Sequence, residues 1–341
     1  MHRRRPGSVL LLALLLTAVA RAQSEGPVDS PSDEPLTPKR DPLLDRAHDR
    51  MYDAVWRSSM MVDHWFGAQY PSSVYQKGVS GSIAPALLWD QFDGFQPRLR
   101  FNANFPLPQL NERFNAFIGR VDRDEFVTER SEPSGAFRRQ FGPATNEETI
   151  LGLGYSSPLK QGWRLDAGAG IQLGFPMDPY VKGSAIYQHG DVQKLLFTFR
   201  ETPFWQASEE FGTTTRVDIE RMFTGPWLVR WTSSGTLSQE TSGIRGYSSI
   251  MGLRGFQGRR AFAVELGFNG ESNAPVPLQD YGIKFAWRQS VLRKWLIMEV
   301  RTSVDWPKDD VTQDRHSSLG VGMGFEMLFG TEEFLARPVT F

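Results

Sequence analysis

Three consecutive stretches near the C-terminus alternate apolar residues with polar or small ones: 280–288 reads DYGIKFAWR, 296–306 reads LIMEVRTSVDW and 319–329 reads LGVGMGFEMLF. In the first stretch, the odd-numbered positions carry Tyr, Ile, Phe and Trp, and the even-numbered positions carry Asp, Gly, Lys, Ala and Arg. Successive side chains of a β-strand point to opposite faces of the sheet. Each stretch therefore predicts a strand whose two faces lie in different solvents.

The length of these stretches favours a particular kind of sheet. Strands of soluble proteins are usually about five or six residues long, whereas strands that cross a bilayer need about ten. The same rhythm continues from Gly78 to Gly330. We therefore predict an all-β fold, a transmembrane antiparallel up-and-down β-barrel over 78–330, with about fourteen strands and a range of twelve to sixteen. The expected strands are 79–91, 95–106, 112–123, 145–157, 163–175, 178–190, 193–204, 208–222, 226–240, 243–256, 259–271, 277–290, 294–306 and 316–329.

The composition excludes several classes of function. The 341 residues include 38 basic and 39 acidic ones, so there is no excess positive charge to attract nucleic acid. The chain has no cysteine, which excludes disulfides, thiolate metal sites, cysteine nucleophiles and a lipidated N-terminal cysteine. We expect no cofactor. The sequence contains no D-x-[DN]-x-[DN]-G loop, so it does not predict a calcium site of that kind.

The N-terminal region has three predicted parts. Residues 1–22 have a basic start, a short apolar core and the small residues Ala20 and Ala22, which predict a signal peptide cleaved after Ala22. A membrane anchor is the alternative, but the apolar run is short for one. Residues 23–41 are rich in Pro, Ser and acidic residues and predict a flexible leader. Residues 42–67 predict an amphipathic periplasmic helix that packs on the barrel, plugs it or binds a periplasmic partner.

The connections between the expected strands fall into two groups. Those after even-numbered strands are short, and those after odd-numbered strands include all the long ones. The long ones are Asp124–Ala144, Pro203–Ala207, Ser272–Val276 and Pro307–Arg315. Short periplasmic turns and longer external loops are typical of outer-membrane barrels.

The charged side of each strand predicts the lumen. An Arg on the lipid side at mid-bilayer costs roughly 2–4 kcal/mol, so the charged face has to be the inner one. The predicted lumen-lining residues are Arg98, Arg100, Arg164, Asp166, Arg216, Asp218, Glu220, Glu265, Lys284, Arg288, Glu299, Arg301 and Glu326. Five Trp residues fall near predicted strand ends, where the bilayer surface suits amphipathic rings. They are Trp163, Trp205, Trp227, Trp295 and Trp306.

With these features, the chain resembles bacterial outer-membrane β-barrel proteins as a broad class, over the signal peptide and the strand region. The resemblance implies outer-membrane lipids and the barrel-assembly machinery as partners. It also implies that an aromatic residue closing the last strand, here Phe329, is the assembly signal. A C-terminal tail, 331–341, departs from this pattern. It ends in Phe341, but Pro338 interrupts the alternation before it.

Residues for catalysis are few. His316 lies beside Asp314 and Ser317, which is the best hydrolase candidate, and His189 lies near Asp191. The sequence thus favours a channel or a barrel that binds and transports a small solute. The first alternative is a structural barrel, or an assembly or anchor barrel, whose N-terminal helix plugs the lumen or binds a periplasmic partner. A weaker alternative is a barrel-embedded hydrolase.

Overall fold

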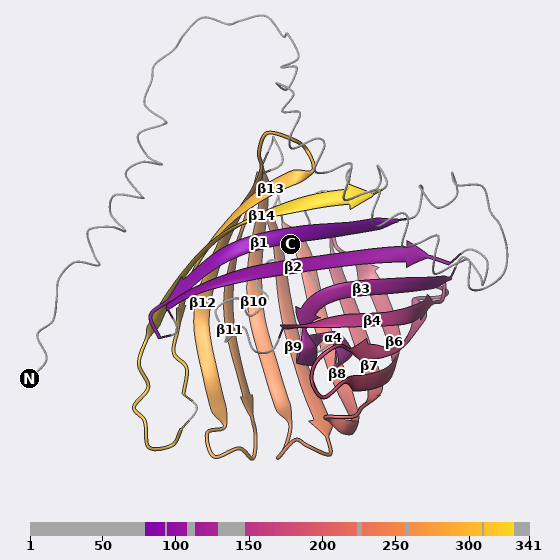
Figure 1. Ribbon diagram of the computed structural model, residues 1–341, viewed down its shortest axis with the longest axis horizontal. Coiled ribbons are helices and arrows are strands. Elements are labelled where there is room, and N and C mark those ends of the chain that lie inside the picture. Colours follow the sequence, from indigo (N-terminus) through magenta and orange to yellow (C-terminus); the bar gives the residue numbers. More distant parts are fainter. Residues whose placement is uncertain are drawn as a thin grey trace, which may run out of the picture. The chain divides into compact units, whose positions relative to one another are not determined.

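The structure is a computed structural model, which describes residues 79–92, 94–107, 113–128, 147–223, 227–256, 260–308 and 310–330. It contains fourteen β-strands and one short helix, α4 (Arg123–Thr128) (Figure 1). The strands are β1 (Ser80–Asp90), β2 (Gly94–Pro106), β3 (Phe114–Asp122), β4 (Glu147–Ser156), β5 (Trp163–Gln172), β6 (Asp178–Asp191), β7 (Leu195–Gln206), β8 (Glu210–Phe223), β9 (Trp227–Ser238), β10 (Arg245–Phe256), β11 (Arg260–Glu271), β12 (Leu278–Ser290), β13 (Leu296–Asp305) and β14 (Ser318–Gly330).

Every strand pairs with its neighbours in the sequence, and β1 pairs with β14, so the sheet closes into an antiparallel up-and-down barrel. Closure leaves none of these strands with a free edge. The prediction of fourteen strands is confirmed, and each strand lies within a few residues of its expected range. The signal peptide with Ala20 and Ala22, the leader, the helix over 42–67 and the tail 331–341 lie outside the described residues.

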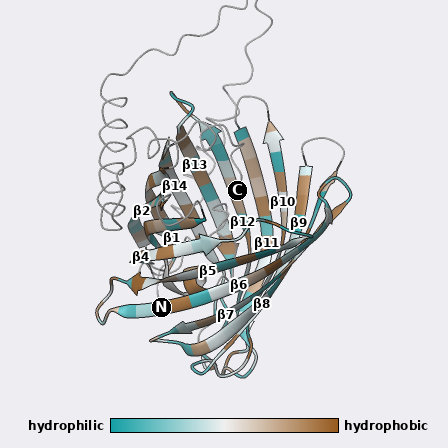
Figure 2. Ribbon diagram, turned by 90° about the vertical axis from the view of Figure 1, so that its right-hand side faces the viewer, coloured by the Kyte–Doolittle hydropathy of each residue, from teal (hydrophilic) through white to brown (hydrophobic). Residues whose placement is uncertain are grey.

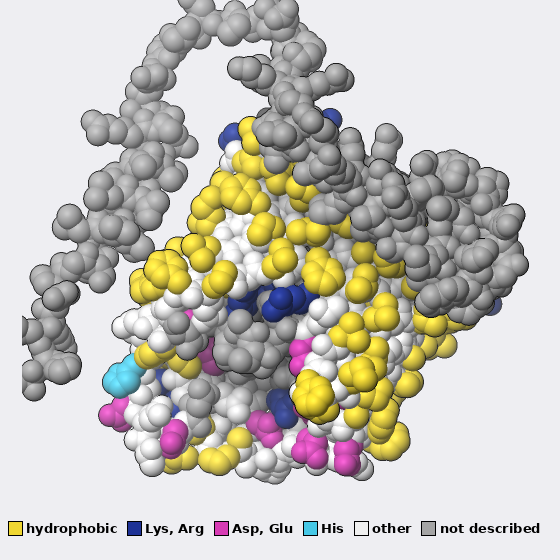
Figure 3. Space-filling model, viewed as in Figure 1, with side chains coloured by type: hydrophobic (Ala, Val, Ile, Leu, Met, Phe, Trp, Pro, Cys, Tyr) yellow, Lys and Arg dark blue, Asp and Glu magenta, His cyan; other side chains and the backbone are white. Residues whose placement is uncertain are grey.

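The outer face of the barrel carries large apolar side chains. Leu165, in the middle of β5, exposes 56% of its surface and Leu266, in β11, exposes 57%. Figure 2 shows hydrophobic and hydrophilic residues alternating along the strands, and Figure 3 shows hydrophobic side chains spread over the flanks. Exposed apolar surface of this extent is a site for lipid or protein contact rather than for water.

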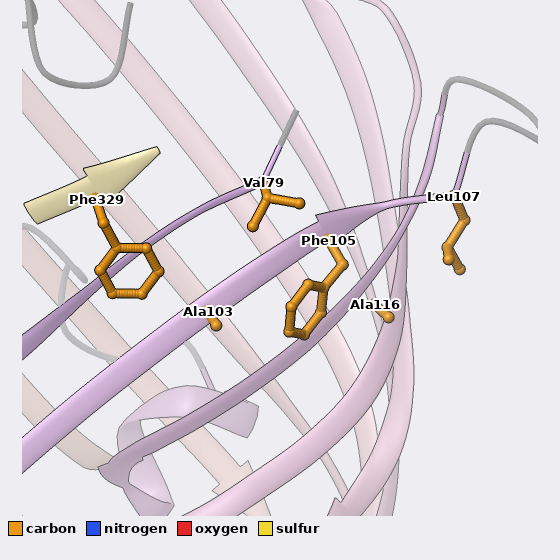
Figure 4. Packing of buried hydrophobic residues seen from close by; sticks show 6 residues of the cluster. All are labelled: Val79, Ala103, Phe105, Leu107, Ala116 and Phe329. Atoms are coloured by element: carbon orange, nitrogen blue, oxygen red, sulfur yellow. The ribbon is translucent and has the colours of Figure 1, made fainter. Parts of the chain in front are cut away.

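The first and last strands meet at a hydrophobic cluster. Phe329 is 1% exposed and belongs to a group of buried residues from β2, β3, β14 and the positions just before β1 and just after β2. Figure 4 labels the members, which are Val79, Ala103, Phe105, Leu107, Ala116 and Phe329. Phe329 pairs with Gly81 of β1. The cluster therefore joins the two strands whose pairing closes the barrel. The role of Phe329 as an assembly signal stays a prediction.

Pro203 corrects one predicted connection. We expected residues 203–207 to be a loop, but β7 runs to Gln206 and only 207–209 connect it to β8. Proline has no N–H to donate, and the β6–β7 register accordingly goes from Lys182↔Phe204 to Ala185↔Glu201 without pairs in between. A single missing ladder bond is tolerated, so the strand continues through the proline.

The two groups of connections differ less than expected. The longest described connection, 306–317, follows the odd-numbered strand β13, as predicted. However, β4 and β5 are joined by 157–162, whereas 207–209 after β7 are only three residues. Connection length therefore distinguishes the two ends of the barrel at 123–146 after β3 and at 306–317 after β13, which both follow odd-numbered strands as predicted, and not at the shorter connections.

Candidate functional site

The short helix α4 identifies the interior face of the barrel. The ring of Phe126, in α4, lies 5.1 Å from the ring of Phe117 in β3 and 5.9 Å from that of Tyr180 in β6. Two strands, β4 and β5, separate β3 from β6. A side chain reaches across two strands in this way only from the concave side of the sheet. Phe117 and Tyr180 thus point inward, and α4 lies in the lumen.

From these two residues, the register assigns a face to every paired residue around the ring. All thirteen charged residues singled out from the sequence fall on the interior face. Six of them are buried, namely Arg98, Arg216, Asp218, Glu265, Arg288 and Glu299. Figure 3 shows basic and acidic side chains gathered in the hollow between apolar flanks. That these residues line a conducting pore is part of the proposal below.

A first charge network joins β12, β13 and β14. The Nε of Arg288 lies 3.3 Å from Oε2 of Glu299, and the same guanidinium also pairs with Glu326. Arg301 pairs with Glu299. Because Arg288 and Glu326 belong to strands separated by β13, this pair reaches over the inner surface of the sheet. Buried charges require such partners, since an isolated ion in a poorly hydrated site is costly.

A second network lies on β8 and β9. Nε and Nη2 of Arg216 each donate a 2.8 Å hydrogen bond to one carboxylate oxygen of Asp218, which makes the pair bidentate. The hydroxyl of Thr232 also donates to Asp218 Oδ1, at 2.6 Å. Arg216 is 2% exposed. Bidentate pairs of this kind fix both side chains as well as neutralising them.

Sequence reasoning missed several interior charged residues. Arg230 pairs with Glu220, and Arg245 lies 3.0 Å from Glu209 and 3.3 Å from Glu271. Arg230 sits in 227–231, WLVRW, which shows no alternation, so the residues gave no signal for its face. The neighbouring strand β8 alternates clearly, and its residue Glu220 faces the lumen. Because Glu220 pairs with Arg230 in the β8–β9 register, Arg230 faces the lumen too.

The lumen is nearly balanced in charge. Of the thirteen predicted residues, seven are basic and six are acidic, and the ion pairs above join opposite charges within one strand, as in Arg216–Asp218, or between strands, as in Arg288–Glu299 and Arg288–Glu326. Paired charges produce a short-range field rather than a net potential along the lumen. This arrangement makes the interior of the barrel polar, with its charges largely paired.

The helix α4 narrows this interior. We expected residues 124–144 to be an outer loop, but 123–128 form a helix inside the barrel. Val127 is fully buried against Ile150, Tyr180 and Phe204, all of which point inward. Nζ of Lys182 donates a 2.7 Å hydrogen bond to the carbonyl oxygen of Phe126 and lies 4.5 Å from the centroid of its ring. The chain turns inward because these side chains are buried there.

The hydrolase candidates do not assemble into a site. Asp314, His316 and Ser317 are all exposed, and no hydrogen bond joins them in the part of the chain that the structure describes. His189 stacks on Tyr187, with ring centroids 6.4 Å apart, while Asp191 accepts a hydrogen bond from the backbone N–H of Gln193. Across the described ranges there is no group of three metal-ligating side chains. None of the described helices is long and apolar enough to cross a membrane.

A closed antiparallel barrel of fourteen strands, with apolar side chains outside and charged ones inside, is the architecture of outer-membrane β-barrel proteins as a broad class. Similar solved structures include the outer-membrane channel DcaP of Acinetobacter baumannii, with 8% identity and a TM-score of 0.48 over 74% of this chain and 96% of that one. An anion-selective porin from Comamonas acidovorans has 9% identity and a TM-score of 0.45, with coverage of 74% and 98%.

OmpT of Vibrio cholerae, expressed in the outer membrane, likewise has 9% identity and a TM-score of 0.45, over 74% of this chain and 97% of that one. At these identities, the likeness concerns the fold alone. No family model and no curated protein matches the chain.

Proposed function

We propose that this protein is an outer-membrane channel that passes small polar solutes with little charge selectivity. The observation that carries the proposal is the contrast between the two faces of one closed sheet. The outer face exposes Leu, Ile and Phe, and the inner face holds networks of paired charges such as Arg216–Asp218. Hydrocarbon outside and water inside would satisfy both faces at once.

The size of the barrel supports passage rather than a packed interior. Eight strands enclose a space that side chains fill, while sixteen to eighteen leave an open aqueous channel. Fourteen strands lie between these limits. Outer-membrane lipids are the proposed surroundings of the exposed apolar face.

Liposome swelling tests this proposal. Purified protein is folded into liposomes and diluted into isotonic solutions of neutral polar solutes of increasing size. We expect swelling rates that fall with solute size and that differ little between a neutral amino acid and its similarly sized charged analogues. If liposomes with correctly folded protein swell no faster than empty ones for every solute, the channel proposal is wrong.

A second candidate is a closed barrel that serves as an anchor, and the position of α4 in the lumen favours it. A channel and a plugged barrel should differ in swelling rate when residues 23–78 and the contact between Lys182 and α4 are removed. In swelling assays, a variant that lacks 23–78 and carries Lys182→Met is compared with the intact chain. Swelling by the intact chain supports the channel, whereas swelling by neither protein supports the anchor.

A further inference from the structure

The interior wall formed by β2 to β6 holds a pocket beside α4, with a volume of about 370 Å³. Its polar lining includes Asn102, Asn104 and Asn115, and its apolar lining includes Phe117 and Phe126. None of these residues belongs to the ion-pair networks described above. Small-molecule sites usually span about 300–1,000 Å³ and combine apolar walls with a few placed polar groups. The pocket fits the lower part of that range.

The three asparagines are held by bonds that leave part of each carboxamide for a ligand. Asn115 Nδ2 donates to Asn104 Oδ1, and Asn102 Nδ2 donates to Ser82 Oγ, both at 2.8 Å. A carboxamide has two donor hydrogens and an acceptor oxygen. The amide nitrogen of Asn104 and the carbonyl oxygens of Asn102 and Asn115 thus remain for hydrogen bonds with a solute. Donors and acceptors side by side match neighbouring hydroxyl groups, each of which donates and accepts.

Glycines create the hollow in front of these amides. Gly154 and Gly168, which pair across β4 and β5, face the lumen where other strands carry side chains. A Cβ on Gly154 would lie 2.7 Å from Oδ1 of Asn115. Glycine at this position is therefore required for the present placement of the Asn115 carboxamide.

The charged groups at the edge of the pocket each have a partner, and Oδ1 of Asp166 is a buried acceptor without one. Asp166 lies 3.1 Å from Arg164, and Lys182 donates to the carbonyl oxygen of Phe126. A charged ligand would have to compete with these partners, while a neutral one need not. Phe117, which is the register partner of Asn104, and Phe126 add apolar lining beside the amides, suited to the C–H groups of a sugar ring.

We propose that this pocket is a binding site for a neutral saccharide of one or two sugar units. The proposal deepens the proposed channel function, because the sugar would be a transported solute held in the lumen. Binding itself does not require an open pore. Its measurement on detergent-solubilised protein therefore tests the pocket separately from transport.

Saturation-transfer NMR with the purified full chain measures binding of glucose and maltose. Sodium gluconate serves as an anionic polyol and a short poly(ethylene glycol) as a neutral polymer without hydroxyl groups along its length. We expect weak, saturable binding of glucose or maltose, and no saturable binding of the polymer. Asn104→Leu should raise the Kd by roughly tenfold or more, because a site built to hydrogen-bond a hydroxyl discriminates strongly when that bond is lost. Gln188→Leu, an interior carboxamide that bonds Thr198 outside the pocket, is the matched control and should leave the Kd unchanged.

Four results would overturn the saccharide site: no saturable binding of either sugar, equal Kd values in the Asn104→Leu variant and the wild type, equal losses in both variants, or tighter binding of gluconate than of glucose. Binding without liposome swelling would contradict the channel and leave the saccharide site in place. Liposome swelling without saturable sugar binding would contradict the saccharide site and leave the channel in place.

Discussion

Lys182, in β6, donates its ammonium hydrogen bond to the backbone carbonyl oxygen of Phe126, in α4, at 2.7 Å, and its Nζ lies 4.5 Å from the centroid of the Phe126 ring. One side chain of the barrel wall thus holds the backbone and the ring of the inward helix. A hydrogen bond from a charged donor stabilises by about 1.5–3 kcal/mol, and a cation over an aromatic face adds to it. Lys182 is therefore the residue that we expect to decide whether α4 stays against the wall.

Lys182→Met should loosen α4 while preserving side-chain length. Loss of the charged hydrogen bond would shift the balance between docked and undocked helix by roughly tenfold or more. We expect larger and noisier single-channel currents in planar bilayers. Lys284→Met removes an interior lysine of β12, which pairs with Glu265 and Ser303 in the register and not with α4, and is the control. Identical current traces for the two variants would show that Lys182 does not restrain the helix.

Arg216→Ala should destabilise the barrel by about 3–5 kcal/mol, because it leaves the buried carboxylate of Asp218 without its bidentate partner. The double variant Arg216→Met with Asp218→Leu should recover most of this loss, since it removes both charges at similar volume. Urea unfolding in lipid vesicles, followed by tryptophan fluorescence, measures the difference. A double variant that is as unstable as the single one would contradict the assignment of the loss to the unpaired charge.

Gly81→Ala should impair closure of the barrel. A Cβ on Gly81 would lie 2.5 Å from Cζ of Phe329 and 2.2 Å from the carbonyl oxygen of Asn102, so either β1 or the ring has to move. Gly252→Ala is the matched control, because a Cβ there meets nothing within 4 Å. We expect Gly81→Ala to fold more slowly into vesicles and to lower the midpoint of unfolding, with Gly252→Ala close to wild type. Equal folding of both variants would show that the Gly81–Phe329 contact is not needed for closure.

Leu99→Arg and Asn102→Arg place the same charge on opposite faces of β2. Leu99 points outward and is 47% exposed, whereas Asn102 points inward and lines the lumen pocket. Arginine on the lipid face near mid-bilayer costs roughly 2–4 kcal/mol. In vesicles, Leu99→Arg should therefore lose stability by that amount and Asn102→Arg by much less. A reversed order would mean that lipid does not surround the outer face.

The strands were predictable because two solvents enforce alternation. In 280–288 and 319–329, every second residue is large and apolar, and the structure places strands β12 and β14 there. The same rule assigned the faces of Arg164 and Arg216, where neighbouring residues are small or apolar. It failed to assign Arg230, because Leu228, two residues earlier on the same face, is as apolar as Val229 and Trp231 on the other face.

Other features were not predictable from alternation. The helix α4 is six residues long, too short for a helical period to appear, and it lies inside the barrel through contacts with residues distant in sequence, such as Tyr180. Glu201 is an outward residue of β7 whose carboxylate accepts hydrogen bonds from Thr213 and Thr215 of the next strand. Its partners depend on the β7–β8 register, which no local pattern specifies.

Single-channel recording in planar bilayers tests the central claim most directly, which is that water fills a charge-balanced interior. Purified full-length protein is added under a salt gradient, and its conductance and reversal potential are measured. We predict discrete current steps and a reversal potential near zero, since the interior charges are paired. A folded protein that gives no current steps would contradict an aqueous interior, and a reversal potential near that of a single ion would contradict the charge balance.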